Sequence, residues 1–127
     1  MYIEKMLYKK FNYNDLVSYF SEIKNICATE KVFINMLNGY RFELKKAGIS
    51  KDNEELFGVQ NTYYKFIEIY SIPHSNLSQL IDTIAHEIAH IKFSKHGRQH
   101  TKFKMQIKAA FKAIMEYNRC KNFSIAS

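Results

Sequence analysis

The pattern of apolar and polar positions predicts one helix near the start of the chain. Over residues 14–28, apolar side chains recur every three or four positions, which is the spacing of one helical face. Asn12 or Asn14 can cap the first turn, because a short polar side chain accepts hydrogen bonds from backbone N–H groups there. We expect Cys27 in the core, since it lies on the same stripe as Leu16, Phe20 and Ile23.

The apolar spacing changes to every second residue after this helix. Residues 32–37 and 41–45 both alternate, and Asn38-Gly39 between them is a strong signal for a tight turn, because its positions need positive φ. The pattern therefore predicts a β-hairpin. Two further strands are expected at residues 56–60 and 62–71.

Two helices are expected in the last part of the chain. The first starts at Ser75 or Asn76 and ends near Phe93, and the second starts near Gly97. The first has an apolar stripe of Leu77, Leu80, Ile81, Ile84, Ile88 and Ile91, and the second one of Phe103, Ile107, Ala110, Phe111 and Ile114. A helix, a small antiparallel sheet of three to four strands and two more helices make an α+β fold. No repeat or linker divides the chain, so we expect one domain over residues 1–127.

Composition and charge narrow the class of protein. The chain has 127 residues and a net charge of +7. Residues 1–90 hold ten Lys/Arg against eleven Asp/Glu, a balance of −1, and residues 91–127 hold nine against one, a balance of +8. No run approaches the roughly 18 apolar residues of a membrane helix, and the start lacks the features of a secretory signal. Two widely spaced cysteines form no disulfide framework, so we expect a cytoplasmic protein with no membrane partner.

Four of the five histidines fall within fifteen residues, and two of them form the pattern His86-Glu87-Ile88-Ala89-His90. Residues four apart on a helix project side by side, so the two imidazoles can bind one metal ion. Glu87 projects to one side of them, where it can take a proton from water on the metal. Both histidines lie opposite the apolar stripe, whereas packed core histidines would be expected on it.

A catalytic zinc ion usually has three protein ligands and keeps a fourth position for water. We expect His96 as the third ligand, because the residues before it suffice to end the helix and fold the chain back. Gly97 lies where an unusual backbone angle would help that reversal. His100 keeps three roles open: an alternative ligand, a group that stabilises charge at the substrate carbonyl, or a packed neighbour. Glu116 is a weaker competitor on the basic outward face, and His74 is expected on the surface.

The stretch HEIAHIKFSKHGRQHTKF resembles zincin metallopeptidases of the SprT-like and WLM group. These have HExxH, a short spacer, and a histidine before Gly or Ser, which match His86, Glu87, His90, His96 and Gly97. The resemblance covers about residues 30–115. It implies a minimal zincin fold, one zinc ion and cleavage of polypeptide, with some members acting on proteins trapped on DNA. The pattern of residues 1–127 predicts neither a Cys-rich zinc ribbon after the motif nor a separate DNA-binding module.

These observations predict a zinc metalloprotease that hydrolyses polypeptide through Glu87. The strand at 62–71 is expected to pair with an extended substrate. Non-specific DNA contact is a further expectation, through a basic row on the last helix that comprises Arg98, Lys102, Lys104, Lys108 and Lys112. The alternative is that the same row is a solvent-exposed lysine face of the helix that aids solubility and contacts no partner. Two other functions stay open: a zinc-dependent nucleic-acid hydrolase, and a non-catalytic nucleic-acid-binding module in which His100 closes the zinc site.

Overall fold

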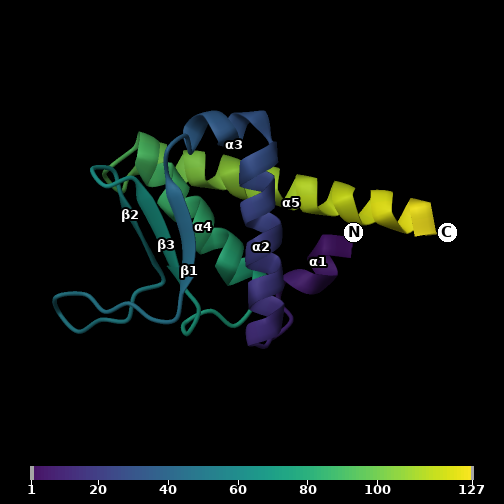
Figure 1. Cartoon of the computed structure of the whole chain (residues 1–127), viewed down its shortest axis with the longest axis horizontal. Helices are drawn as coiled ribbons and strands as arrows, with labels where there is room; N and C mark the ends of the chain where they lie inside the picture. The colour runs from purple at the N-terminus through teal and green to yellow at the C-terminus, as the bar shows by residue number, and fades with distance from the viewer. Residues whose placement is uncertain (1, 127) are drawn as a thin grey trace.

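The computed structural model describes residues 2–126, and Figure 1 shows the order of the elements along the chain. Five helices and three strands form an α+β fold. The elements are α1 (Tyr2–Leu7), α2 (Tyr13–Thr29), α3 (Lys31–Met36), β1 (Arg41–Lys45), β2 (Gly58–Asn61), β3 (Phe66–Tyr70), α4 (Leu77–Lys92) and α5 (Arg98–Ala126).

Helix α2 confirms the first predicted helix and identifies its cap. The side chain of Asn12 accepts a hydrogen bond from the backbone N–H of Asp15 (2.8 Å), and the Asp15 carboxylate accepts one from the N–H of Asn12 (3.1 Å). This reciprocal capping box satisfies two backbone donors that the helix cannot satisfy itself. Cys27 is buried in the core, as predicted. The other cysteine, Cys120, is exposed, and both are free thiols.

The predicted β-hairpin at residues 32–45 is wrong, because its first half is helix α3. Phe33 is buried and stacks on Phe111 with ring centroids 4.7 Å apart, and Met36 and Leu37 pack against the same core. Positions i, i+3 and i+4 share one face of a helix, so this packing requires helical backbone. Gly39 has a φ of 81° in the turn after the helix, and this turn leads into β1.

The sheet is mixed, which corrects the predicted antiparallel arrangement. The strand order is β1-β3-β2, in which β1 runs parallel to β3 and β2 runs antiparallel to it. Between β1 and β2 the chain passes through a long loop that includes the predicted loop at residues 47–55. The chain thus passes from β1 at one edge of the sheet to β2 at the other edge. The β2–β3 hairpin then places β3 in the middle. Both edges of β3 are therefore paired, and β2 is an edge strand.

The β2–β3 hairpin divides the predicted strand at 62–71. Residues 62–65 form its turn, in which the Asn61 side chain accepts a hydrogen bond from the N–H of Tyr64 (2.8 Å). Lys65 has a φ of 53°, so the backbone reverses there and β3 begins only at Phe66. The predicted strand at 56–60 is shifted to Gly58–Asn61.

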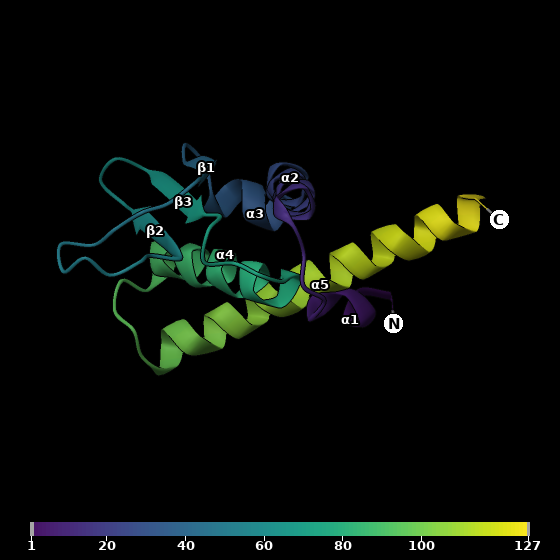
Figure 2. The same ribbon diagram turned by 90° about the horizontal axis from the view of Figure 1, so that it is seen from below.

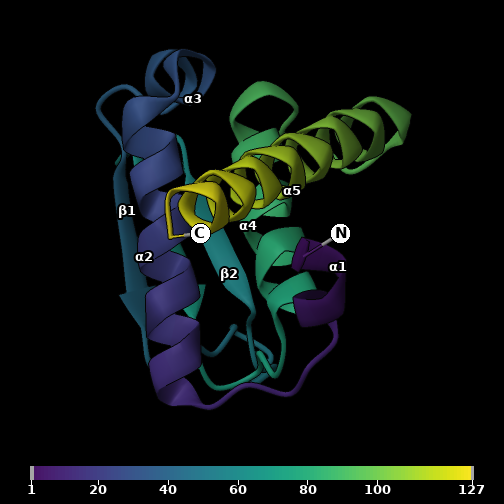
Figure 3. The same ribbon diagram turned by 90° about the vertical axis from the view of Figure 1, so that its right-hand side faces the viewer.

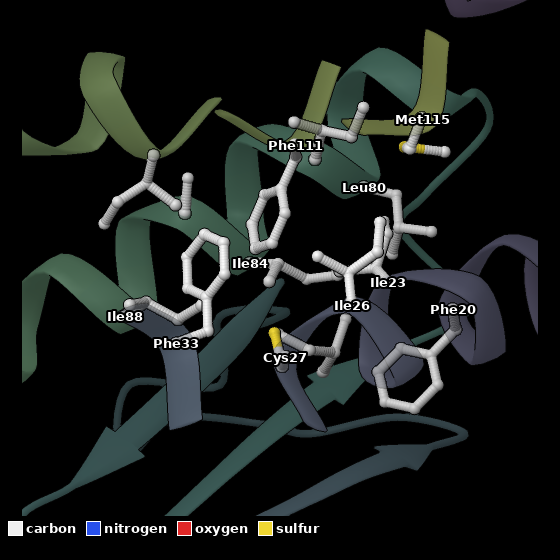
Figure 4. Packing of buried hydrophobic residues seen from close by; sticks show 14 of the residues in the cluster. Phe20, Ile23, Ile26, Cys27, Phe33, Leu80, Ile84, Ile88, Phe111 and Met115 are labelled. Carbon is white, nitrogen blue, oxygen red and sulfur yellow. The ribbon is translucent and has the colours of Figure 1, made fainter. Parts of the chain in front are cut away.

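Helix α4 lies between the sheet and the first half of α5, as Figure 2 shows. Asn76 caps α4 by accepting a hydrogen bond from the N–H of Gln79 (2.9 Å), which confirms one of the two predicted starts. The predicted stripes of both helices face one core. Figure 4 shows Ile84 and Ile88 of α4 with Phe111 of α5 and residues of α2 in this core. The C-terminal end of α5 extends beyond the rest of the molecule (Figure 2).

The sequence pattern did not predict α1, which packs against α5 (Figure 3). The Glu116 carboxylate accepts hydrogen bonds from the N–H groups of Tyr2 (2.7 Å) and Ile3 (2.9 Å), while Ile3 and Leu7 are buried. Glu116 thus stabilises the start of α1 and does not belong to the histidine cluster. Within residues 2–126, no helix has the length and apolarity needed to cross a membrane.

Candidate metal centre

Helix α4 holds His86 and His90 one turn apart, on the face that its apolar stripe leaves free. Both side chains are partly exposed, and their Nε2 atoms lie 3.2 Å apart. This is the convergence that the spacing of four residues predicts for two imidazoles on one helix.

The connection between α4 and α5 brings in a third imidazole. Phe93 leaves the helical conformation with φ −126° and ψ 101°, and the chain then turns back towards α4. As a result, the Nε2 atom of His96 lies 3.0 Å from that of His90 and 3.1 Å from that of His86. Gly97 does not have the unusual backbone angle that we expected, because its φ is not positive. Its carbonyl instead accepts the hydrogen bond from the N–H of Thr101 that starts α5 (2.9 Å).

The three Nε2 atoms form a nearly equilateral triangle with sides of 3.0–3.2 Å. A tetrahedral zinc ion with imidazole nitrogens at about 2.0–2.1 Å would separate these nitrogens by about 3.3–3.4 Å. The triangle is therefore only slightly smaller than the one that zinc requires, and three imidazoles are a donor set that suits this ion.

The imidazoles of His86 and His90 favour the neutral form that binds metals. Burial, followed by the neighbouring histidines, lowers the pKa of His86 to about 4, and burial also lowers the pKa of His90. The Nδ1–H of His90 donates to the carbonyl of Phe93 (3.1 Å), so its Nε2 keeps a free lone pair. The backbone that ends α4 thus also fixes one candidate ligand.

His100 is buried behind these rings and forms part of a second trio. One nitrogen from each of His86, His90 and His100 can be chosen so that all lie within 4.8 Å of one another, which is close enough to hold a metal ion. The Nε2–H of His100 donates to the backbone carbonyl of His86 (3.0 Å), so only its Nδ1 is free to bind an ion. We favour the trio with His96, because its nitrogens are closer together and their lone pairs are not occupied in this way.

Glu87 is a largely buried residue whose carboxyl group is accessible from two hollows and has no hydrogen-bond partner among the described residues. Its exposed fraction is 7%, and it makes no hydrogen bond or ion pair within the part of the chain that the structure describes. Burial raises its pKa to about 7. A buried structural carboxylate is normally paired, because burial of an unpaired charge is costly. The Glu87 carboxyl is therefore suited to act on a molecule that enters the site.

Two hollows give access to Glu87 from the side of the edge strand β2. The first, of about 330 Å³, is lined by Phe57, Gly58, Gln79, Asp82, Thr83, His86 and Glu87. The second, of about 360 Å³, is lined by Gly58, Val59, Gln60, His86, Glu87, His90, Ser94 and His96. The sequence pattern did not assign β2 to the site. A glycine inside a predicted strand was the available signal, since it often marks a close approach of the backbone.

His74 is buried, which corrects its expected position on the surface. Its Nδ1–H donates to the carbonyl of Tyr70 (2.6 Å), and its Nε2 lies 2.8 Å from the hydroxyl of Thr83 on α4. The first bond makes Nε2 an acceptor, so the Thr83 hydroxyl donates to it. His74 thus ties the end of β3 to α4 one turn before Glu87.

The predicted basic row on α5 is interrupted by an acidic partner. The ammonium groups of Lys104 and Lys108 both contact the same carboxylate oxygen of Asp82 on α4, at 3.2 and 2.9 Å. Arg98 and Lys102 are exposed, and Lys112 is partly exposed. Two of the five residues expected to contact DNA are therefore engaged within the protein.

No protein-family model, curated protein or solved structure matches this chain. The resemblance to zincin metallopeptidases consequently rests on the motif residues alone.

Proposed function

We propose that this protein is a zinc-dependent endopeptidase of the HExxH type. The observation that carries the proposal is the largely buried Glu87, whose carboxyl has no hydrogen-bond partner among the described residues, beside three converging imidazole nitrogens. A purely structural zinc site would gain nothing from such a carboxyl, whereas hydrolysis requires a base at that position.

In this proposal His86, His90 and His96 hold the ion. When bound, zinc polarises the scissile carbonyl and makes the attacking water more acidic. Glu87 accepts a proton as the water oxygen bonds to the carbonyl carbon. It returns this proton to the amine nitrogen as the C–N bond breaks. Burial raises the pKa of the Glu87 carboxyl to about 7 in the metal-free protein, and a bound cation would lower it towards the form that accepts a proton.

The edge strand β2 replaces the predicted strand at 62–71 as the element that pairs with substrate, because β3 has no free edge. The carbonyl of Phe57 accepts a hydrogen bond from the N–H of Tyr70 (2.9 Å), and the register is antiparallel. Pairs alternate in such a ladder, so the N–H and C=O groups of Gly58 and Gln60 point to the open edge. Addition of a substrate strand there would bring its backbone past Glu87 without demanding a particular sequence.

The decisive variant is Glu87→Gln, which keeps the size of the side chain and removes the base. We expect it to retain one zinc ion and the fold while kcat for a casein or quenched-peptide substrate falls about 10²–10⁴-fold. Glu54→Gln, the same change in an exposed loop, is the control and should retain activity. Full hydrolysis by zinc-loaded Glu87→Gln would remove Glu87 from the mechanism. Cleavage of labelled RNA with no cleavage of casein would instead support the nucleic-acid hydrolase.

A further inference from the structure

A third hollow lies on the loop side of the histidine cluster, where α4 ends and α5 begins. It has a volume of about 510 Å³, and its lining includes His96 and His100. Three cationic side chains also line it, namely Lys92, Lys95 and Arg98. The hollow shares Ser94 and His96 with the hollow along β2, so an extended chain that passes the histidines can reach both.

The charges around this hollow are positive and unpaired. Within residues 2–126, none of Lys92, Lys95 and Arg98 forms an ion pair with a carboxylate. No Asp or Glu occurs between Glu87 and Glu116 in the sequence. The Lys92 ammonium lies over the rings of Phe93 (5.6 Å) and Phe103 (5.1 Å), and these cation–π contacts hold it at the rim.

The arrangement of these cations favours one anionic group over a long polyanion. The lysines that would continue the row along α5, Lys104 and Lys108, share the Asp82 carboxylate. Lys92, Lys95 and Arg98 therefore form a local group in one concavity beside the proposed reaction centre, whereas the row along α5 is interrupted between Lys102 and Lys112.

We propose that this hollow binds a carboxylate of the polypeptide substrate and so determines specificity, an inference that rests on the proposed peptidase function. Lys95 and Arg98 supply charge-assisted hydrogen bonds to the carboxylate, and Lys92 adds to the positive field. The carboxylate belongs either to an acidic side chain a few residues from the scissile bond or to the C-terminus of the substrate.

Peptide binding to the Glu87→Gln protein tests this without turnover. Matched peptides carry Glu or Gln at each position within three residues of the scissile bond, each with a free or amidated C-terminus. Calorimetry at low salt gives the ratio of dissociation constants, and NMR gives the amides that shift. We expect one acidic peptide to bind on the order of tenfold more tightly than its amide counterpart, with shifts over residues 92–98. The position that gives the preference distinguishes a side chain from a C-terminus.

The binding is measured with and without zinc, because a carboxylate can also bind the ion directly. The preference should persist without zinc and fall to near onefold in a Lys95→Gln, Arg98→Gln double variant. Lys121→Gln, a loss of charge on the exposed far part of α5, should keep the preference. Circular dichroism checks that each variant is folded.

Several outcomes would overturn the inference: equal binding of acidic and amide peptides, no peptide binding, a preference that survives the double variant, or shifts over residues 92–98 produced only by an oligonucleotide. The peptidase function and the carboxylate site are refuted by different outcomes. A zinc-loaded wild-type protein that prefers the acidic peptide but cleaves nothing would refute the peptidase alone, whereas equal cleavage and binding of both peptides would refute only the carboxylate site.

Discussion

The Nε2 atoms of His90 and His96 lie 3.0 Å apart, although one belongs to α4 and the other to the connection that follows it. Because the Nδ1–H of His90 donates to the carbonyl of Phe93, its Nε2 presents a lone pair towards His96, as a shared metal ion would require. The short reversal after Phe93 thus brings in a candidate ligand that the helix alone cannot supply.

His96 and His100 should differ in their effect on metal affinity. We expect His100→Ala to weaken zinc binding about 10–100-fold, as is typical for a residue that supports a ligand without binding the metal. His96→Ala should weaken zinc binding further, because it removes a proposed ligand. Competition with a zinc chelator measures both constants on the folded variants. A larger loss with His100→Ala would show that the trio containing His100 holds the ion.

Substitution by alanine should lower the free energy of unfolding at Gly58 and leave it nearly unchanged at Gly97. A Cβ at Gly58 would lie 3.0 Å from the Thr83 methyl group on α4 and 3.1 Å from the backbone carbonyl of Glu68 on β3, so these neighbours must shift by a few tenths of an ångström. We expect Gly58→Ala to lower the free energy of unfolding by about 1–3 kcal/mol. Gly97→Ala meets no atom within 4 Å and should change it by less than about 0.5 kcal/mol. Urea unfolding compares them, and equal effects would contradict the close packing of β2 on α4.

His74 should make stability depend on pH. Burial lowers its pKa below the ordinary value of 6.5, so the folded state binds a proton less strongly than the unfolded state. Above about pH 6.5, His74 is neutral in both states and does not change the free energy of unfolding. As the pH falls from there through the folded-state pKa of His74, the free energy of unfolding decreases. In metal-free protein, the loss of unfolding free energy between pH 7.5 and 5.5 should be smaller in His74→Gln than in the wild type. His86 and His90 contribute the same trend to both proteins. An identical loss in both would show that His74 is not buried in the neutral form.

The features that the sequence predicts correctly are local ones. Asn12 and Asn76 cap helices whose apolar stripes run over several turns, so α2 and α4 follow from short-range rules. The histidine pair is predictable for the same reason, since one helix fixes both side chains. Helix α3 is different, because six residues are too few for alternating and helical patterns to be distinguished. Only the contact of Phe33 with Phe111, far along the chain, decides between them.

The parts of the site that sequence analysis missed depend on packing between distant elements. His74 is buried where it forms a hydrogen bond with Thr83 of α4, and no short-range sequence pattern predicts that contact. The basic row on α5 loses two members because Asp82 faces it across the α4–α5 interface. The place of β2 beside Glu87 likewise follows from a strand order that the chain reaches only through a long loop.

The most direct test of the account is a crystal structure of the zinc-loaded protein with anomalous data at the zinc edge. The account predicts one ion bound by the Nε2 atoms of His86, His90 and His96, a solvent oxygen as the fourth ligand, and the Glu87 carboxylate within hydrogen-bond distance of that oxygen. Imidazoles that point apart with no ion between them would contradict it, and so would a fourth protein ligand that excludes solvent from the ion.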